Sequence, residues 1–387
     1  MSKKRILIFS TAYFPFVGGA EVAVKEITNR IFPASLVSGG FEFIMITAKL
    51  DPKLSEVEKI GNIEIHRIGK GNHWDKYRLI AQGAQYASNL GHFDAVWSIM
   101  ASYAGFAALT YKKRKNTPFL LTLQEGDSRW QIYKHVWWCW PYFKQIFKKA
   151  DRIQAISNYF ANWARNLGAK CPVEVVPNGV DVDKFGDIRD KRYEIRDSIR
   201  QKFNISKNDR IIITVSRLVK KNGVSDLIKA MKFLDSDTQL LIVGDGELKN
   251  RLVLLVNRLG LVDRVHFLGN VNHEKLPEYL QASDVFCRPS LNEGLGNSFL
   301  EAMAAGVPVV GTKVGGIPDF LKDNETGLFC KVGDPKNISE NIKKLLEDIS
   351  LKEKLVLNGR KLVEERYGWD LITQKMQGIF NNLCNPL

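Results

Sequence analysis

The chain twice repeats an alternation of short apolar runs with longer segments of helical period, and this repetition restricts the fold more than any other feature. In the first half, strand-like runs occur at 5–9, 43–47, 63–68, 95–98, 119–123, 152–156 and 173–176. The pattern restarts at 211–215, 239–243, 264–267, 284–287, 307–310 and 327–329. Strands alternating with helices form parallel sheets with right-handed crossovers. We therefore predict an α/β protein with two doubly wound, Rossmann-like domains.

A turn-rich segment separates the two arrays. Val176-Pro177-Asn178-Gly179 punctuates the chain, and a charged stretch at 187–202 follows it. We place the domain boundary near residue 180, which gives an N-terminal Rossmann-like domain over 1–180 and a C-terminal Rossmann-like domain over 181–365. The remaining 366–387 is expected to form a C-terminal helix that packs back on the first domain. Such domains bind ligands at the carboxyl ends of their strands, and we expect a cleft between the two.

The cysteines and histidines indicate the cellular compartment and whether a metal site is expected. The five cysteines form no CxxC pair, and the six histidines are scattered without an HExxH motif. We expect no disulfides, a cytoplasmic location and no metal site. The uncharged run Ala95–Tyr111 is interpreted as a buried strand followed by a helix, because a membrane span needs about 20 mostly apolar residues.

The net charge of +14 is concentrated in the first half, where residues 1–185 contain 25 Lys and Arg against 15 Asp and Glu. This asymmetry indicates an anionic partner. No RRM, zinc-finger or basic-helix motif is present, so a nucleic-acid partner is not expected. An anionic membrane surface or a phosphate-bearing acceptor fits better, which would place the protein peripherally at the inner face of the cytoplasmic membrane. The alternative is a solvated surface that happens to be basic.

The most informative motif lies at 289–308, directly after the run at 284–287. Gly294 and Gly296 allow close approach of a ligand to the backbone. Asn297 or Ser298 is expected to cap the following helix, whose amino end favours anions such as a diphosphate. Glu293 precedes Glu301 by eight residues. The structural alternative for Glu301 is a capping box with Ser298.

This Glu-x7-Glu element resembles that of the family 4 retaining glycosyltransferases (glycosyl transferases group 1), which have the GT-B fold. The segments that follow, EAMAAGVPVVGT at 301–312 and VGGIPD at 314–319, are similar to the family as well. The resemblance implies that Glu301 binds the donor ribose hydroxyls and that Glu293 binds the transferred sugar. It also implies that the backbone of Gly294, Leu295, Gly296 and Asn297 contacts the sugar and the phosphates. By the same resemblance, the domain over 1–180 is expected to bind the acceptor and the domain over 181–365 the nucleotide sugar.

Three other loops extend the resemblance. After the run at 211–215, the family has an Arg and, five residues later, a Lys that neutralise the leaving diphosphate; Arg217 matches. In this chain the position five residues after Arg217 is Asn222, and we assign the second positive charge to Lys221. The alternatives are that Lys220 supplies this charge or that Arg217 acts alone. Gly19, in the element Gly18-Gly19-Ala20-Glu21, is expected to face the donor phosphate, and Gly244 and Val271 to line the nucleoside base.

One departure concerns the acceptor side. After the run at 119–123 the family often has His-Gly, whereas this chain has Gln124, which can form hydrogen bonds but cannot take a proton. The reaction that the resemblance implies is front-face transfer of a hexose from a UDP- or GDP-linked donor to a glycan or lipid-linked acceptor. It needs no protein base, no cofactor and no metal ion. Double displacement through Glu293 is the less favoured route.

Rival functions differ in specific features. A non-catalytic nucleotide-sugar-binding subunit would not require Glu293, Glu301 and Arg217 together. A sugar-nucleotide epimerase of the same fold stays open. A nicotinamide dehydrogenase would carry G-x-G-x-x-G after a first strand, which neither array has.

A stretch at 130–143, dense in Trp and Tyr with interleaved Lys, suits either a membrane interface or a buried packing layer.

Overall fold

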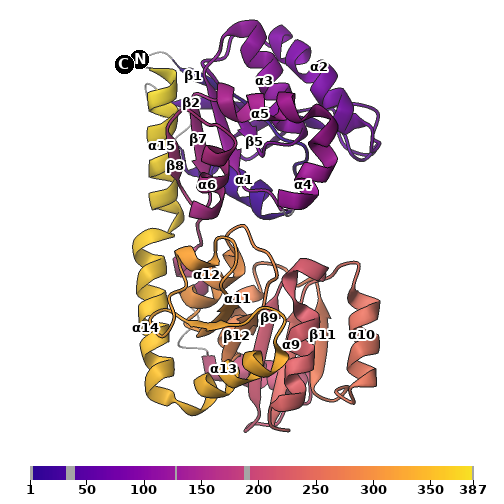
Figure 1. Cartoon of the computed structure of the whole chain (residues 1–387), viewed down its shortest axis with the longest axis vertical. Coiled ribbons are helices and arrows are strands. Elements are labelled where there is room, and N and C mark those ends of the chain that lie inside the picture. The colour runs from indigo at the N-terminus through magenta and orange to yellow at the C-terminus, as the bar shows by residue number, and fades with distance from the viewer. Residues whose placement is uncertain (1–2, 32–39, 127–128, 187–191, 386–387) are drawn as a thin grey trace. The chain divides into compact units, whose positions relative to one another are not determined.

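The computed structural model describes residues 3–31, 40–126, 129–186 and 192–385. The described chain forms two compact units (Figure 1). Unit 1 contains residues 1–179 together with 369–387, and unit 2 contains residues 180–368. Each unit has its own central sheet, which confirms the prediction of two parallel-sheet α/β domains.

The described sheet of unit 1 has the strand order β3-β4-β2-β1-β5-β6-β7-β8. Its strands are β1 (Lys4–Phe9), β2 (Phe41–Ala48), β3 (Val57–Ile60), β4 (Ile63–Ile68), β5 (Ala95–Ile99), β6 (Phe119–Leu123), β7 (Arg152–Ala155) and β8 (Val173–Val175). Neighbours pair in parallel except β3 and β4, which form an antiparallel hairpin. The chain winds outward from β1 in one direction and then resumes at β5 beside it. This places the topological switch point between β1 and β5.

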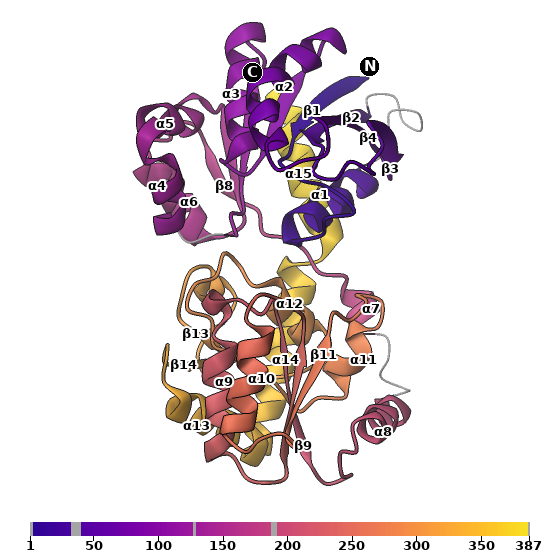
Figure 2. The same cartoon turned by 90° about the vertical axis from the view of Figure 1, so that its right-hand side faces the viewer.

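Helices cover both faces of this sheet (Figure 2). They are α1 (Gly19–Arg30), α2 (Asp75–Asn89), α3 (Tyr103–Lys115), α4 (Arg129–Val136), α5 (Trp140–Lys149), α6 (Asn158–Asn166) and α15 (Trp369–Cys384), with a 3-10 turn η1 (Trp137–Cys139) between α4 and α5. Ile6 and Ile8 of β1 face α1 and α15 in one hydrophobic core. On the other face, Gly83 of α2 lies against the ring of Phe9.

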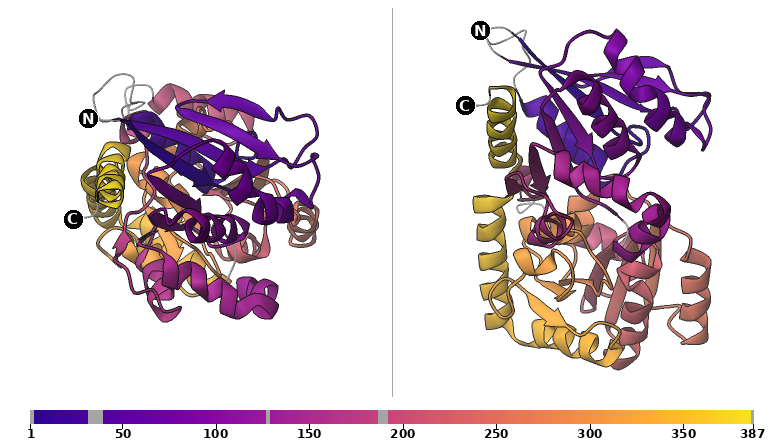
Figure 3. Two further views of the ribbon diagram at one scale, coloured as in Figure 1. Left: turned by 90° about the horizontal axis from the view of Figure 1, so that it is seen from above. Right: turned by 45° about the horizontal axis from the view of Figure 1, so that its top comes forward.

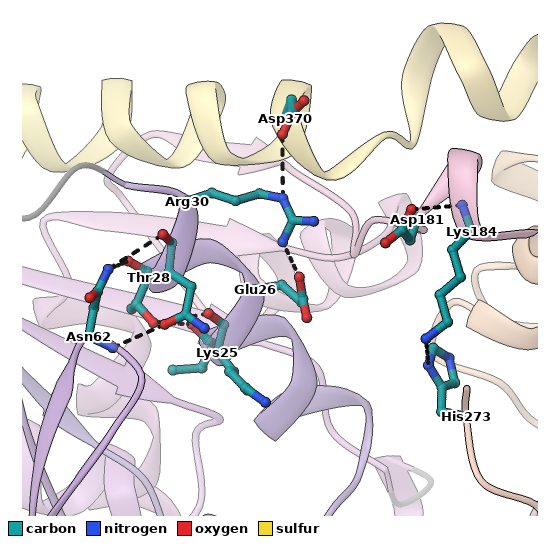
Figure 4. A network of polar contacts seen from close by, with 11 residues as sticks. Lys25, Glu26, Thr28, Arg30, Asn62, Asp181, Lys184, His273 and Asp370 are labelled. Atoms are coloured by element: carbon teal, nitrogen blue, oxygen red, sulfur yellow. Dashed lines mark hydrogen bonds and ion pairs between the residues drawn. The ribbon is translucent and has the colours of Figure 1, made fainter.

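The final helix belongs to unit 1, along whose sheet it runs (Figure 3). Helix α15 buries Ile372, Met376, Ile379, Phe380 and Leu383, whose spacing gives one apolar face. Each fully buried side chain of this size contributes about 1.5–3 kcal/mol. An ion pair adds to the contact: Arg30 Nε of α1 lies 3.4 Å from Asp370 Oδ1 (Figure 4).

The described sheet of unit 2 has the order β11-β10-β9-β12-β13-β14, and every pair is parallel. Its strands are β9 (Arg210–Val215), β10 (Thr238–Val243), β11 (Val265–Gly269), β12 (Val285–Arg288), β13 (Val309–Thr312) and β14 (Leu328–Cys330). The chain leaves β9 through β10 and β11 and returns on the other side of β9 at β12. The switch point of unit 2 therefore lies between β9 and β12, where a ligand is expected.

The helices of unit 2 are α7 (Val182–Gly186), α8 (Arg192–Lys202), α9 (Val224–Ala230), α10 (Lys249–Arg258), α11 (Leu276–Gln281), α12 (Asn297–Ala304), α13 (Pro335–Glu347) and α14 (Ile349–Arg366). The core on one face includes residues of α9, α10 and α13. On the other face, Phe299 of α12 packs against Phe286 of β12. Helix α14 ends at Arg366, and Tyr367-Gly368 separates it from α15.

Candidate functional site

Four predicted ligand-binding loops of unit 2 follow neighbouring strands. Val271 follows β11, Gly244 follows β10, Arg217 follows β9 and Glu293 follows β12. Because these strands are parallel and adjacent, their carboxyl ends meet at one edge of the sheet. The structure thus brings the predicted donor-side residues of unit 2 to a single edge, at its switch point.

Close backbone contacts hold these loops together. Gly244 has a φ of +126°, and a Cβ there would come within 2.0 Å of the Ser216 carbonyl oxygen. Gly315 has a φ of +56°, and a Cβ there would come within 1.7 Å of the Glu293 carbonyl oxygen. The backbone N–H of Leu291 donates to the Lys221 carbonyl at 2.7 Å, which joins the loop after β12 to the loop after β9. Any larger residue at either glycine would push these loops apart.

The loop after β12 leads into α12 through Gly296, which has a φ of +99° and is the N-cap residue. Gly296 makes no side-chain capping bond. The expectation that Asn297 or Ser298 caps this helix is wrong. Both residues lie inside its first turn, and the Ser298 hydroxyl accepts a hydrogen bond from Arg288 at 3.0 Å. The amino end of α12 therefore has no side-chain cap at its N-cap position, and its dipole favours an anion there.

Glu293 forms an ion pair with Arg288, the last residue of β12. Their side chains are only 12% and 10% exposed. Arg288 Nη2 donates to Glu293 Oε2 and also, at 2.9 Å, to Asn222 Oδ1. The other carboxylate oxygen, Glu293 Oε1, accepts the N–H of Gly294 at 3.1 Å. Sequence reasoning missed Arg288, although a charged residue at the end of the apolar run 285–287 was a visible signal.

The capping-box alternative for Glu301 is not formed. Its Oε1 atom lies 3.0 Å from His273 Nε2, and its side chain is 16% exposed. Hydrogen bonding to Glu301 is the main cause that raises the pKa of His273 above its usual value. Glu301 is thus held by a histidine that follows β11. His273 was also missed by sequence reasoning.

Lys184 of α7 lies on the other side of the His273 ring. Its Nζ atom is 3.4 Å from His273 Nδ1 and 2.7 Å from Glu274 Oε1. Figure 4 shows the lysine reaching toward this ring. The backbone N–H of Lys184 donates to Asp181 Oδ1 at 3.1 Å. Since an ammonium group can only donate, Nδ1 of a neutral His273 must accept, and the ring proton then sits on Nε2 facing Glu301.

The basic residues after β9 differ in exposure. Arg217 and Lys220 are exposed, and Lys221 is half-buried. Asn222 is 2% exposed, and its Nδ2 atom donates to the Arg217 carbonyl at 2.6 Å. The asparagine at the fifth position therefore has a structural role, since it orders the backbone on which Arg217 is presented.

The predicted residues of unit 1 lie at the carboxyl edge of its own sheet. Gly19 begins α1, directly after the N-cap residue Gly18. Gln124 follows β6 and is 7% exposed, and its Oε1 atom has no hydrogen-bond partner within the described chain. Next to it, Glu125 Oε1 accepts the N–H of Ala101 at 2.7 Å. A buried carbonyl oxygen without a partner is costly, so Gln124 is a site at which a ligand hydroxyl could bind.

The aromatic stretch at 130–143 is only partly buried. Phe143 is fully buried, but Trp130, Trp137 and Trp138 are 62%, 75% and 70% exposed. The alternative of a wholly buried packing layer is therefore wrong for these three tryptophans, which lie on α4 and η1.

Among the described helices, none is both long and apolar enough to cross a membrane. Within the residues that the structure describes, no group of three or more His, Cys, Asp or Glu is placed to hold a metal ion.

Comparison with known proteins gives consistent matches. The model "Glycosyltransferase Family 4" matches residues 17–184, and the model "Glycosyl transferases group 1" matches residues 195–362. An uncharacterized glycosyltransferase of Methanocaldococcus jannaschii is 27% identical over 410 aligned residues that cover 100% of both chains. A GDP-mannose-dependent monoacylated alpha-(1-6)-phosphatidylinositol monomannoside mannosyltransferase of Corynebacterium glutamicum is 30% identical and covers 75% of this chain and 76% of its own.

Among solved structures, sucrose-phosphate synthase from Thermosynechococcus elongatus superposes with a TM-score of 0.83. It is 23% identical, and the match covers 98% of this chain and 99% of that one. At this identity the likeness shows a shared fold. The fold is GT-B, as the sequence resemblance implies.

Proposed function

The chain belongs to the family 4, group 1 glycosyltransferases, and from that premise we propose that it transfers a hexose, with retained anomeric configuration, from a UDP- or GDP-linked donor to a glycan or lipid-linked acceptor. One observation carries the proposal. Arg217 and Glu293 lie at the carboxyl edge of one parallel sheet, and Glu301, on the helix that begins there, is held by His273 of a neighbouring loop. The N-cap residue of that helix makes no side-chain hydrogen bond. This edge combines hydroxyl acceptors with an anion-binding position, which is what a nucleotide sugar requires.

Each residue then has a role. Glu301 accepts hydrogen bonds from the ribose hydroxyls, and Glu293 accepts them from the transferred sugar. The backbone of Gly294, Leu295, Gly296 and Asn297 contacts the sugar and the diphosphate, and Gly244 and Val271 line the base. Arg217 and Lys221 neutralise the charge that develops on the leaving diphosphate. Gly19 and Gln124 are assigned to the donor phosphate and to the acceptor, on the resemblance of their motifs.

The proposed reaction occurs on one face of the sugar. The bond from the anomeric carbon to the β-phosphate oxygen breaks, and the bond to the acceptor oxygen forms on the same face. The acceptor proton passes to the leaving phosphate oxygen, so no protein base is needed. Glu293 is a poor nucleophile for double displacement, because Arg288 and the Gly294 N–H already bind its two oxygens. The positive groups at this edge supply the charge that a metal ion supplies elsewhere, and we propose that none is required.

We also propose that unit 1 binds reversibly to an anionic membrane surface. No Asp or Glu occurs from Arg129 to Ala150, which holds five Lys and Arg, and none occurs on α3. The two helices α3 and α5 pack together: the rings of Phe106 and Tyr142 stack at 5.5 Å, and Lys113 lies 4.8 Å from the Tyr142 ring centre. Basic residues and exposed tryptophans therefore share one region, a composition typical of a membrane interface. Such binding would hold the protein at the inner face of the cytoplasmic membrane, within reach of a lipid-linked acceptor.

A donor screen tests the enzymatic proposal. The chain is incubated with UDP- and GDP-linked hexoses, and released nucleoside diphosphate and sugar are measured by chromatography. Acceptor-stimulated release from one donor supports the proposal. Interconversion of the donor sugar without release would indicate the epimerase alternative. Tight nucleotide-sugar binding without any turnover, even with glycan and lipid acceptors, would indicate a non-catalytic subunit.

A further inference from the structure

Strand β12 ends on an arginine that is almost completely buried. Arg288 is 8% exposed, and it follows three fully buried residues, Val285, Phe286 and Cys287. Burying a guanidinium group is strongly unfavourable unless its N–H groups are paired. Partners on three different segments reach it, and they lie on the loop after β9, the loop after β12 and the first turn of α12.

These partners leave little freedom to the guanidinium group. Its Nη2 atom donates to Glu293 Oε2 and to Asn222 Oδ1, and its Nη1 atom donates to Ser298 Oγ. Because the guanidinium is planar and its N–H groups have fixed directions, three partners on three segments define its position. The Glu293 carboxylate, bound at one oxygen by this group and at the other by the Gly294 N–H, is fixed in turn.

Asn222 fits this arrangement for a chemical reason. Its amide oxygen accepts from Arg288, and its amide nitrogen donates to the Arg217 carbonyl. A lysine at position 222 has no acceptor atom and would place a second cation against the guanidinium. Asn222 and Arg288 are therefore matched, and together they connect the backbone of Arg217 to the carboxylate of Glu293.

We propose that Arg288 is a positioning residue that holds Glu293 in the orientation in which it accepts hydrogen bonds from the transferred sugar. The inference rests on the proposed function of the same edge. Arg288 then acts on the sugar through Glu293 and does not contact the diphosphate, because the two Nη atoms of Arg288 already donate to Glu293, Asn222 and Ser298. A carboxylate has about four acceptor positions, so Glu293 keeps some for sugar hydroxyls while it is bound by Arg288 and Gly294.

Calorimetric titration distinguishes residues that bind the transferred sugar from residues that bind the nucleotide. UDP is compared with UDP-glucose, and GDP with GDP-mannose, for the unsubstituted protein and for Arg288→Gln, Glu293→Gln and Glu301→Gln. We expect Arg288→Gln and Glu293→Gln to weaken nucleotide-sugar binding by about 10- to 100-fold and to leave nucleoside-diphosphate binding nearly unchanged. Glu301→Gln should weaken both, because the ribose is common to both ligands. The double variant of Arg288 and Glu293 should bind no more weakly than the weaker single variant.

Two further variants control for folding. Arg288→Lys keeps the charge but not the planar fork, and we expect the same selective loss with a smaller effect on stability. Arg196→Gln breaks the 3.0 Å ion pair with Asp284 at the opposite end of β12, and it should change the melting temperature but not the preference for the sugar-bearing ligand.

Two results would overturn the inference. One is an equal loss of nucleoside-diphosphate and nucleotide-sugar binding in Arg288→Lys and Arg288→Gln. The other is unchanged nucleotide-sugar binding in both variants. An unsubstituted protein that binds none of the four ligands contradicts the proposed function itself, and the inference with it.

Discussion

His273 Nε2 lies 3.0 Å from Glu301 Oε1, so the carboxylate assigned to the ribose is held by a titratable ring. The ring also faces Lys184 and Glu274. Its raised pKa means that the protonated ring is stabilised in the folded state. The resulting stability is fully present below the unfolded pKa of about 6.5 and is lost as pH rises through the higher folded value.

We therefore predict that His273→Gln lowers the melting temperature at pH 5.5 and has less effect at pH 8.5. Since half of the His273 side chain is exposed, solvent screening keeps the effect small, below about 1 kcal/mol. Thermal unfolding of both proteins across this pH range measures it. A difference between the two proteins that does not depend on pH would contradict the assignment of the pair.

Glu301→Ala should weaken nucleoside-diphosphate binding by roughly 10- to 100-fold while the fold persists, because one charge-assisted acceptor of the ribose is lost. The helix should tolerate the change, since Glu301 takes no part in capping α12. Calorimetry with UDP and GDP measures the affinity, and circular dichroism checks the fold. Unchanged affinity together with a large loss of stability would assign Glu301 to structure alone.

Arg217→Ala should mainly lower kcat, by about 10²- to 10³-fold, because its charge acts on the leaving diphosphate as the bond breaks. Lys221→Ala should lower kcat as well, and Lys220→Ala, a change at the exposed neighbouring position, serves as the matched control. Steady-state rates at saturating donor decide between them. Normal turnover in Arg217→Ala would remove this residue from the mechanism, and a loss confined to Lys220→Ala would reassign the second charge.

Chelation tests the proposal that no metal ion takes part. We expect turnover to persist after exhaustive treatment with EDTA, because Arg217, Lys221 and the amino end of α12 provide the positive potential. Rates are measured before and after the treatment and after Mg²⁺ or Mn²⁺ is restored. Loss of activity that either ion reverses would show that the leaving group needs a metal.

Co-sedimentation with liposomes tests the membrane surface. The protein should bind vesicles that contain anionic lipid more than neutral vesicles, and the binding should fall as salt rises, because the Debye length drops from about 10 Å at 0.1 M to about 3 Å at 1 M. Replacing Trp137 and Trp138 by serine should weaken it. Trp74→Ser is the matched control, since Trp74 is 69% exposed but precedes α2 and lies outside both α3 and the segment Arg129–Ala150. Equal binding to both vesicle types, or an equal loss in the Trp74 variant, would contradict the assignment.

Much of the fold follows from local patterns. The strands at 63–68 and 119–123 have the predicted bounds. The first alternates isoleucine with polar residues over most of its length, the second is almost wholly apolar, and turn residues lie on either side of both. The missed strand β3 has no such run. Its four residues alternate between exposed and half-buried, and it forms only by pairing with β4 across the turn at Gly61. The Gly61-Asn62 dipeptide between Ile60 and Ile63 was the available sign of this hairpin.

The candidate site, like the fold, could be predicted from the sequence only in part. Glu293 and the glycines of the loop after β12, together with Glu301 of α12, stand in a recognisable order, so the sequence alone predicts them as site residues. Arg288 and His273 have partners 66 and 89 residues away along the chain, and such contacts appear only once the elements of unit 2 are placed side by side. Exposure of Trp137 and Trp138 likewise depends on how α4 and η1 lie on unit 1, which the aromatic composition leaves open.

The anomeric configuration of the product tests the central claim most directly. The chain is incubated with the donor that the screen identifies, and proton NMR records the first sugar released or transferred, before mutarotation. The account predicts that this sugar keeps the anomeric configuration of the donor, and that the signal disappears in Arg217→Ala. An inverted product, or no transfer from any UDP- or GDP-linked hexose, would contradict it.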